Sequence, residues 1–436
     1  MKKIRRILLL LIVLLLAVSI TTSVQSANPR IDVITIKGTI NPVLVDYVKR
    51  GIEEAEDSRA EALIIQMDTP GGLDMAMRDI IQLIVNSRVP VAVYVAPSGS
   101  RAASAGLYIL QSSHIAVMAP NTATGSATPV SLGGDGEAEM SDELKAKIIN
   151  DATAYIRSLA ESHGRNADWA AKAVLEGVSV TEQEALDLNV IDMVAPDLDA
   201  LITQLDGWQV TMLDGRQITL QTQGATTNDV PMKTIEGFLY AIADPNIAYL
   251  LMSLAMLGIM AEIFNPGLIF PGVVGGISLL LAFYSLGVLP VNYAGVLFIV
   301  LAFGLFVAEV LTTTFGLFTA GGVISLVIGS LILFQGASPV FRVDPWLIAT
   351  VTIVIAGAFV FIIQRAISAH RKQAKTGWEE LIGKTAIVKV ALNPEGTVFL
   401  KGERWSAISE EELVKPGEEV VIKKVDGLIL HVTKKQ

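Results

Sequence analysis

Ser104 stands where a nucleophile could act, between a strand-like run at 90–96 and a helix-compatible stretch at 104–112. A helix that begins here offers free main-chain amides and the positive end of its dipole, and both stabilise an oxyanion. Serine at such a position is more often only an N-cap of the helix. Taken alone, Ser104 therefore fits capping better than catalysis.

A glycine pair, Gly71 and Gly72, follows a second strand-like run at 62–67. Glycine at a strand end lets the main chain approach a substrate and aim an amide at a developing tetrahedral oxygen. Together with the amide of Ala105, the pair predicts an oxyanion hole. The same Pro-Gly-Gly sequence is also compatible with an ordinary turn.

Few bases are available to a serine nucleophile, because the 436-residue chain has four histidines and no cysteine. His114 begins a strand-like run at the end opposite the site, and His163 lies at a predicted helix C-terminus. Neither has an evident orienting carboxylate, which favours a lysine whose pKa is lowered by apolar surroundings. Lys145 and Lys147 lie near the apolar stripe of a helix predicted over 141–162, and helical spacing does not separate them.

The segment that carries these residues alternates strand-like and helix-compatible runs. The strand-like runs are 31–36, 62–67, 90–96 and 114–119, and the helix-compatible stretches are 43–57, 73–87 and 104–112. This alternation predicts βαβ units and a largely parallel sheet. Loops at the carboxyl ends of such strands form binding sites, and Gly72 and Ser104 both lie in or after such loops.

The middle of the chain is predicted to lie in lipid. Hydrophobic residues make up 52% of the sequence, and only four charged residues occur between 246 and 363. Five segments have the length of a membrane span: 246–263, 268–289, 293–311, 317–335 and 345–363. A basic cluster at 365–375 predicts a cytoplasmic C-terminal side, so five crossings leave residues 28–235 outside.

Two further features agree with export of that segment. Residues 1–27 have a basic start, an apolar core and a small polar end, as in a secretory signal peptide or an uncleaved anchor. The absence of cysteine is compatible with an exported domain that needs no disulfides. The net charge of −10 argues against a general nucleic-acid binder.

The membrane part contains an internal sequence repeat. Ala261-Glu262 and the glycine-rich run 275–279 recur as Ala308-Glu309 and 321–326, which predicts a duplicated helical hairpin. The glycines favour close helix packing. Both glutamates fall at predicted cytoplasmic helix ends, where an interfacial role is favoured over an ion pathway.

Residues 378–436 have the composition of a soluble domain again. Strand-like runs at 385–390, 396–400, 419–422 and 428–432 are divided by turn residues and predict a small five-stranded barrel of OB type. Acidic and basic residues are nearly balanced here. A docking module is therefore favoured over an oligonucleotide-binding one.

Residues 67–72 and 97–106, with Gly125 in the next loop, resemble the ClpP-class membrane-bound serine proteases of the long NfeD type. The resemblance covers essentially the whole chain, including residues 402–407 of the terminal barrel. It implies an α/β ClpP/crotonase-like exported domain over 28–235, a transmembrane bundle of about five helices over 236–364 and an all-β OB-type NfeD domain over 378–436.

The same resemblance implies a Ser-Lys dyad, with Ser104 as the nucleophile. It selects Lys147 as the base, because residues 147–160 are similar to the family's helix around its catalytic lysine. The oxyanion donors are the amides of Gly72 and Ala105, with Gly71 shaping the turn. A glycine-rich loop at 130–140 is longer than in the family pattern and could hold Lys147 away from the serine until substrate binds. No metal or cofactor is implied.

The implied function is a membrane-anchored serine endopeptidase that cuts hydrophobic segments of membrane-associated proteins, with a stomatin-like protein as substrate or partner. The implied surroundings are the lipid bilayer and other copies of the chain, joined through the protease domain, without nucleic acid. An alternative is a non-catalytic membrane scaffold that binds stomatin-like partners. A transporter is supported by the predicted spans alone.

Overall fold

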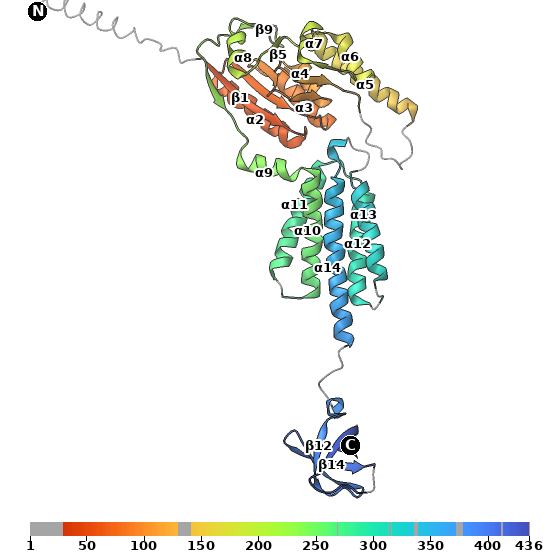
Figure 1. Ribbon diagram of the computed structural model, residues 1–436. Coiled ribbons are helices and arrows are strands. Elements are labelled where there is room, and N and C mark those ends of the chain that lie inside the picture. Colours follow the sequence, from red (N-terminus) through yellow and green to blue (C-terminus); the bar gives the residue numbers. More distant parts are fainter. Residues whose placement is uncertain are drawn as a thin grey trace, which may run out of the picture. The chain divides into compact units, whose positions relative to one another are not determined.

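The computed structural model describes residues 29–129, 141–267, 269–312, 314, 316–334, 339–371, 378–410 and 413–435. They form an N-terminal α/β domain, a group of apolar helices and a C-terminal barrel (Figure 1). The predicted signal or anchor at 1–27 and the predicted long loop at 130–140 lie outside the described residues.

A six-stranded sheet forms the centre of the N-terminal domain. Its order is β11-β1-β2-β3-β5-β8, and every neighbouring pair is parallel. The strands are β1 (Arg30–Lys37), β2 (Ala62–Asp68), β3 (Val91–Val95), β5 (Ile115–Met118), β8 (Met193–Val194) and β11 (Thr226–Asp229). The predicted parallel sheet is therefore confirmed. Strand β11 was not expected, because its polar sequence has no strand pattern. It is extended only because its main chain pairs with β1.

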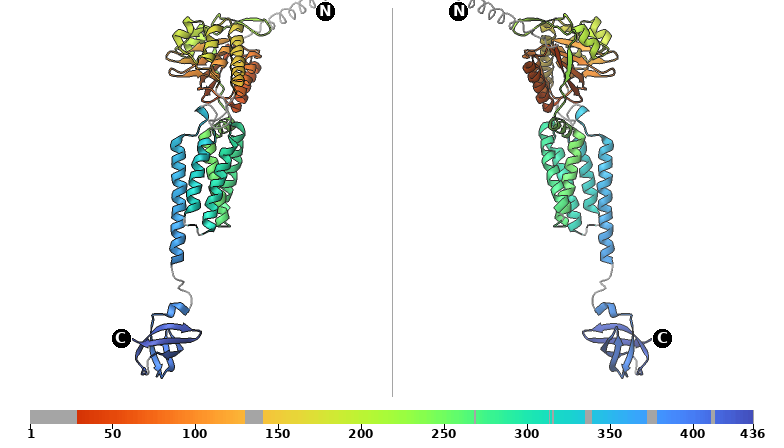
Figure 2. Two further views of the ribbon diagram at one scale, coloured as in Figure 1. Left: turned by 90° about the vertical axis from the view of Figure 1, so that its right-hand side faces the viewer. Right: turned by 90° about the vertical axis from the view of Figure 1, so that its left-hand side faces the viewer.

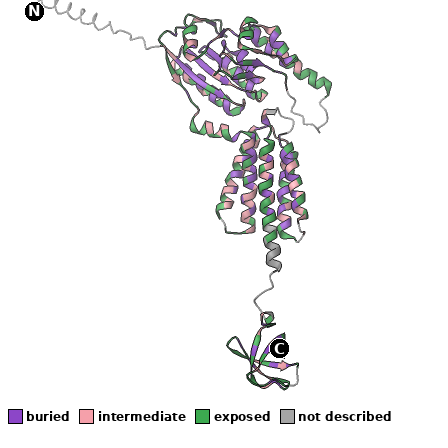
Figure 3. Cartoon of the chain, in the orientation of Figure 1, coloured by how far each residue is buried: buried purple, intermediate pink, exposed green. Residues whose placement is uncertain are grey.

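Side chains of the central strands alternate between two hydrophobic cores. In β2, Leu63 and Ile65 face one core, whereas Ala62 and Ile64 face the other. Purple strands in Figure 3 show that both faces are covered. The first core is covered by α2 (Pro42–Ser58), α3 (Asp74–Val85), α4 (Ala105–Ser112), α5 (Asp142–Ser162), α6 (Ala167–Leu175) and α7 (Glu182–Asp187). The second is covered by α8 (Leu198–Leu205) and the hairpin of β9 (Gln209–Thr211) and β10 (Gln217–Thr219).

A small three-stranded sheet lies beside the large one and leads into α4. It consists of β4 (Arg101–Ala103), β6 (Ala123–Gly125) and β7 (Ser179–Thr181), with β4 and β6 parallel and β6 and β7 antiparallel. Because β4 ends at Ala103, its pairing with β6 fixes the backbone directly before Ser104.

Helices form over all five segments predicted as membrane spans: α10 (Pro245–Phe264), α11 (Ile269–Val288), α12 (Tyr293–Leu311), α13 (Leu317–Ile332) and α14 (Pro345–Arg371). Helices α10 to α13 run side by side in both views of Figure 2. Among the described residues, α10, α11 and α12 are long and apolar enough to cross a membrane, while α13 and residues 345–361 form shorter apolar helices. The structure thus provides three candidate spans, and five crossings stay a prediction.

The repeated glutamates occupy equivalent places in two helical hairpins, α10–α11 and α12–α13. The carboxylate of Glu309 accepts hydrogen bonds from the amides of Gly316 at 2.8 Å and Thr319 at 3.0 Å. That of Glu262 accepts from Gly267 at 3.3 Å. In each hairpin the carboxylate holds the turn that leads to the next helix, which supports a structural role at the helix ends.

The C-terminal strands close into a five-stranded barrel in the order β12-β13-β14-β16-β15. The strands are β12 (Thr385–Val390), β13 (Glu395–Leu400), β14 (Glu403–Ser409), β15 (Glu419–Asp426) and β16 (Ile429–Lys434). Val388, Val398 and Leu430 are among the fully covered side chains of its core. The predicted barrel of five strands is confirmed.

Candidate active site

Ser104 is the residue before α4, but it does not cap that helix. Its side chain makes no capping hydrogen bond, and its hydroxyl has no partner among the residues that the structure describes. Its backbone has φ 54° and ψ −117°, a strained conformation for a residue with a side chain. The more common interpretation of a serine before a helix is therefore wrong for Ser104.

Main-chain hydrogen bonds hold this strained residue in place. The amide of Ser104 donates to the carbonyl of Gly125 at 3.0 Å, which continues the pairing of β4 with β6. On the other side of β4, the amide of Ala103 donates to the carbonyl of Thr69 at 3.1 Å. The backbone at Ser104 is therefore held between the end of β6 and the residue that follows β2.

Position 71 must be glycine because Ser104 lies too close for a side chain there. Its φ is +118°, and a Cβ atom there would lie 2.8 Å from the Cβ and 3.2 Å from the Oγ of Ser104. The amide of Gly71 already donates to the Thr69 hydroxyl at 3.0 Å. Gly71 thus shapes the turn, and its own amide is occupied.

Two amides at the site remain available for an oxyanion. Within the described part of the chain, the amides of Gly72 and Ala105 donate to no acceptor. Gly72 is pressed against Ile40, whose carbonyl oxygen would lie 2.1 Å from an added Cβ, so its backbone is firmly held. Gly72, Ala105 and Ser104 line one common pocket. The structure brings together four of the five predicted site residues.

Two spaces open beside Ser104. The first, which we call the polar cleft, has a volume of about 510 Å³ and is lined in part by Thr124, Ser126 and Ser179. The second, the apolar pocket, has a volume of about 160 Å³. It is lined by Gly72, Ala105, Leu73, Met77, Tyr108 and Ala127, among others. Such a pair of spaces suits a peptide main chain with an apolar side chain.

Tyr108 has its polar end fixed within the wall of the apolar pocket. Its hydroxyl donates to the carbonyl of Ala152 on α5 at 3.4 Å, and its ring stacks on Tyr155 at 6.2 Å between centroids. Burial raises the pKa of the Tyr108 phenol above its ordinary value, so this group stays a neutral donor. Tyr108 therefore supports the pocket and does not act as a base.

Lys147 is the predicted residue that the structure does not bring to the site. It lies on the exposed first turns of α5, as does Lys145, and neither lines the polar cleft or the apolar pocket. For the described residues, neither ammonium group has a hydrogen bond or an ion pair. The dyad is therefore not assembled in this structure, in which residues 130–140 directly before α5 are not described.

Both histidines of the N-terminal domain lie near the other end of α4. Their rings meet edge to face with 6.2 Å between centroids, and the amide of Val91 donates to Nδ1 of His114 at 3.2 Å. Burial lowers the pKa of His114 to about 4 and also lowers that of His163. Neither ring lines a space beside Ser104, which agrees with the structural role expected for both.

The buried His114 predicts a loss of stability in mild acid. Its pKa is about 4 in the folded chain and 6.5 ordinarily, so the unfolded chain takes up the proton first as the pH falls from 6.5 to 4. We expect this to remove up to about 3 kcal/mol of unfolding free energy. His114→Asn keeps an acceptor for Val91 but does not titrate. Denaturant titrations at pH 7 and 4.5 should show a smaller acid loss in the variant, and equal losses would contradict the assignment.

Arg165 is a positioning residue that the sequence did not reveal. Its guanidinium is fully buried, donates to the carbonyls of Gln111 at 3.0 Å and Ser113 at 2.9 Å, and pairs with Asp192 at 2.6 Å. These contacts hold the C-terminal end of α4, whose other end presents Ser104. Because its acceptors are mostly main-chain oxygens, no pattern of side chains in the sequence could have indicated this role.

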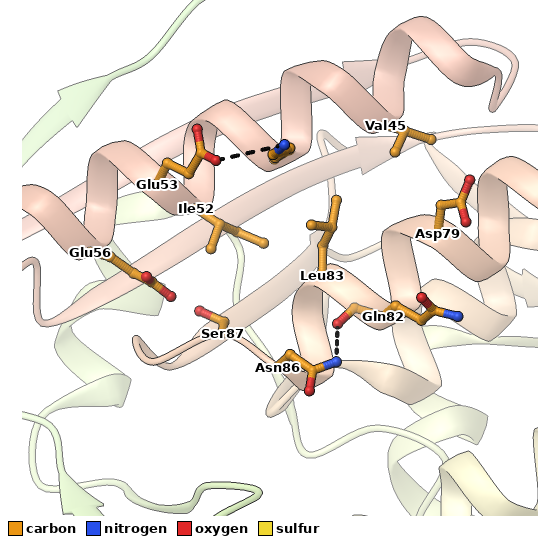
Figure 4. Close-up of a pocket in the computed structure, with 10 residues that line it drawn as sticks. Val45, Ile52, Glu53, Glu56, Asp79, Gln82, Leu83, Asn86 and Ser87 are labelled. Atoms are coloured by element: carbon orange, nitrogen blue, oxygen red, sulfur yellow. Dashed lines mark hydrogen bonds and ion pairs between the residues drawn. The ribbon is translucent and has the colours of Figure 1, made fainter.

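A third space, between α2 and α3, is a surface groove of about 460 Å³ (Figure 4). Its walls include Glu53, Glu56 and Asp79. Glu56 accepts from the amide of Arg88 at 2.8 Å, and Glu53 lies 4.0 Å from Lys49. Ser87 also lines the groove, but its hydroxyl donates to the carbonyl of Val89 at 2.8 Å. Among the described residues, no group of three or more His, Asp or Glu side chains could hold a metal ion.

Comparison with known proteins covers all three parts of the chain. Residues 30–200 match the NfeD1b N-terminal domain, 246–365 the NfeD integral membrane domain, and 379–434 the NfeD-like C-terminal, partner-binding domain. The membrane-bound protease PH1510 of Pyrococcus horikoshii is 39% identical over 440 residues, which cover 99% of this chain and 98% of that protein. The chain belongs to the NfeD family.

Two further proteins are similar to this NfeD-family protein. The membrane protein NfeD1b of Bacillus subtilis is 28% identical over 449 residues, covering 97% of each chain. The solved 1510-N membrane-bound stomatin-specific protease, a lysine-to-alanine mutant in complex with a substrate peptide, is 37% identical. That structure covers 50% of this chain and 98% of its own, with a TM-score of 0.46. The predicted NfeD family is thereby confirmed.

The contact between Gly71 and Ser104 predicts a large effect of one methyl group in this NfeD-family protein. Gly71→Ala adds a Cβ at φ +118° and 2.8 Å from the Ser104 Cβ, so Ser104 must shift. We expect labelling of Ser104 by a serine-reactive probe to slow at least about 100-fold. Gly99→Ala is the matched control, since Gly99 has φ +91° with open space around it. A similar loss in both variants would indicate general backbone strain instead.

Proposed function

We propose that this chain is a membrane-anchored serine endopeptidase that cuts hydrophobic segments of membrane-associated proteins, with stomatin-like proteins as its substrates. Its catalytic residues are Ser104 and Lys147. The observation that carries the proposal is the strained Ser104, whose hydroxyl shares a pocket with the amides of Gly72 and Ala105, all three without a hydrogen-bond partner among the described residues. The relative described as a stomatin-specific membrane protease supports the substrate class.

The proposed chemistry is acyl transfer. The Oγ of Ser104 attacks the peptide carbonyl carbon while its proton passes to the neutral amine of Lys147. The carbonyl oxygen becomes an oxyanion that accepts from the amides of Gly72 and Ala105. Lys147 returns the proton to the leaving amine, and water then hydrolyses the acyl-enzyme by the same route in reverse. Lys147 must approach Ser104 for these steps, with a movement of the start of α5 when substrate binds.

The arrangement in the membrane is part of the same proposal. We propose that the protease domain lies outside the cytoplasm and the barrel inside it, with five crossings between them, and the signal-like N-terminus and the basic cluster at 365–375 support this orientation. The barrel's strand order, first-second-third-fifth-fourth, supports an OB-type docking domain. We also propose that copies of the chain associate through the protease domain.

A non-catalytic scaffold for stomatin-like partners is the second candidate. It is favoured by one observation, the exposed position of Lys147 away from Ser104. A fluorophosphonate probe, which reacts only with an activated serine, separates the two functions. Labelling of the full-length chain in detergent, lost in Ser104→Ala and kept in Ser126→Ala, is the result expected of the peptidase. A native chain that takes up no probe would favour the scaffold.

A further inference from the structure

A turn between two helices of the membrane domain reaches both spaces beside Ser104. The 3₁₀ turn η1, Pro339–Phe341, lies between α13 and α14. Phe341 lines the apolar pocket, as Met77 does, and Val340 lines the polar cleft. Two consecutive residues, more than 200 positions after the nucleophile in the sequence, therefore form part of its surroundings.

Buried and exposed residues alternate along this turn. Phe341 is 3% exposed and Val343 is 6% exposed, whereas Arg342 and Asp344 between and after them are exposed. An aromatic side chain in a short turn outside a helix loses its water contact only by packing against another part of the chain. For Phe341, that part includes the wall of the apolar pocket.

An ion pair and hydrogen bonds connect the N-terminal domain, α9, α10 and this turn. Helix α9 (Thr234–Ile242) is bound to the N-terminal domain by the ion pair of Glu236 with Arg50 at 2.7 Å. The hydroxyl of Tyr240 on α9 also donates to a carbonyl at the end of β1, at 2.9 Å. From α10, the Asn246 side chain then accepts from the amide of Asp344 at 2.8 Å, three residues after Phe341. A chain of polar contacts thus leads from the protease domain to η1.

We propose that Phe341 is a specificity-determining residue of the peptidase. Supplied by the membrane domain, it closes one side of the subsite for an apolar substrate side chain and limits the size of that side chain. Small and medium aliphatic side chains fit the remaining volume of about 160 Å³, and large aromatic ones are disfavoured. This inference rests on the proposed peptidase function.

The kinetic test compares two peptides that differ only in the residue before the cut bond, valine or tryptophan. In the full-length chain in detergent, Phe341→Ala should raise kcat/KM for the tryptophan peptide relative to the valine peptide at least about 10-fold. Val343→Ala is the matched control, because Val343 is buried in the same turn region but lines neither space. An unchanged ratio in Phe341→Ala, or an equal change in both variants, would overturn the proposal.

A second test does not depend on catalysis. Because the chain has no cysteine, Met77→Cys with Phe341→Cys creates the only thiol pair. Mild oxidation should form this disulfide in high yield, measured by mass spectrometry of the linked peptides. The control pair is Met75→Cys with Phe341→Cys, since Met75 is 79% exposed on the same helix. Equal yields would place Phe341 outside the pocket and refute the proposal, whereas a high yield without any peptide hydrolysis would refute only the peptidase function.

Discussion

Replacement of Ser104 by alanine is expected to lower kcat/KM for an apolar peptide by at least about 10⁴-fold, because the proposed acyl-enzyme forms on its hydroxyl. The folded chain should be preserved. The Ser104 hydroxyl makes no hydrogen bond with any described residue, so its removal leaves no buried partner unsatisfied. Alanine also keeps the Cβ that packs against Gly71. The measurement is initial rates with wild type and variant at equal concentration.

The matched control for this experiment is Ser126→Ala. Ser126 lines the same polar cleft and also has a positive φ, 48°, but its hydroxyl pairs with that of Ser179 at 2.8 Å. We expect less than about a tenfold loss in this variant, because its two lost hydrogen bonds, to Gly177 and Ser179, lie away from the nucleophile. If Ser104→Ala retains the wild-type rate, the peptidase proposal fails and the scaffold remains.

Lys147→Ala is expected to reduce kcat/KM at least about 10³-fold, since in the proposed mechanism Lys147 both takes the proton from Ser104 and returns it to the leaving amine. Lys145→Ala is the control, because Lys145 is exposed two positions earlier on the same helix. It should stay within about twofold of wild type, as surface substitutions have small effects. Equal losses in both variants would show that the positive charge of α5, and no particular lysine, matters.

Lys147→Arg sharpens this test. Arginine keeps the charge and the length of the side chain, but its guanidinium cannot be deprotonated to act as a base. We therefore expect Lys147→Arg to be as inactive as Lys147→Ala. An active arginine variant would mean that Lys147 only attracts or positions the substrate.

Lys147 lies at the exposed start of the same helix, α5, that contributes Ala152 to the apolar pocket. Ala152, five residues further along α5, is buried and lines the apolar pocket with Ser104. At 1.5 Å per residue, Lys147 lies about 7.5 Å along the helix axis from a residue of the pocket wall. Five residues also turn about 140° around the helix axis, so the proposed approach of Lys147 to Ser104 requires the first turns of α5 to rotate or unwind as well as to shift.

Local pattern was sufficient to predict most of the fold. Short continuous aliphatic runs indicated β1, β2, β3 and β5. Parallel strands are buried on both faces, so their side chains are apolar on both sides of the sheet. Apolar length indicated the helices of the membrane part, and turn residues between short runs indicated the barrel. Strand β11 could not be found in this way, since its sequence is polar and only the free edge of β1 makes it a strand.

The sequence by itself determined the order of the three parts, the family and the place of Ser104 beside the glycine pair. All of these follow from short-range patterns of residue type. Only the tertiary structure decided that Ser104 is no cap, that the amides of Gly72 and Ala105 are free, and that Lys147 stands apart. Likewise, Arg165 and Phe341 reach their places through contacts with distant segments. Such contacts depend on how whole elements pack, and local composition does not encode that packing.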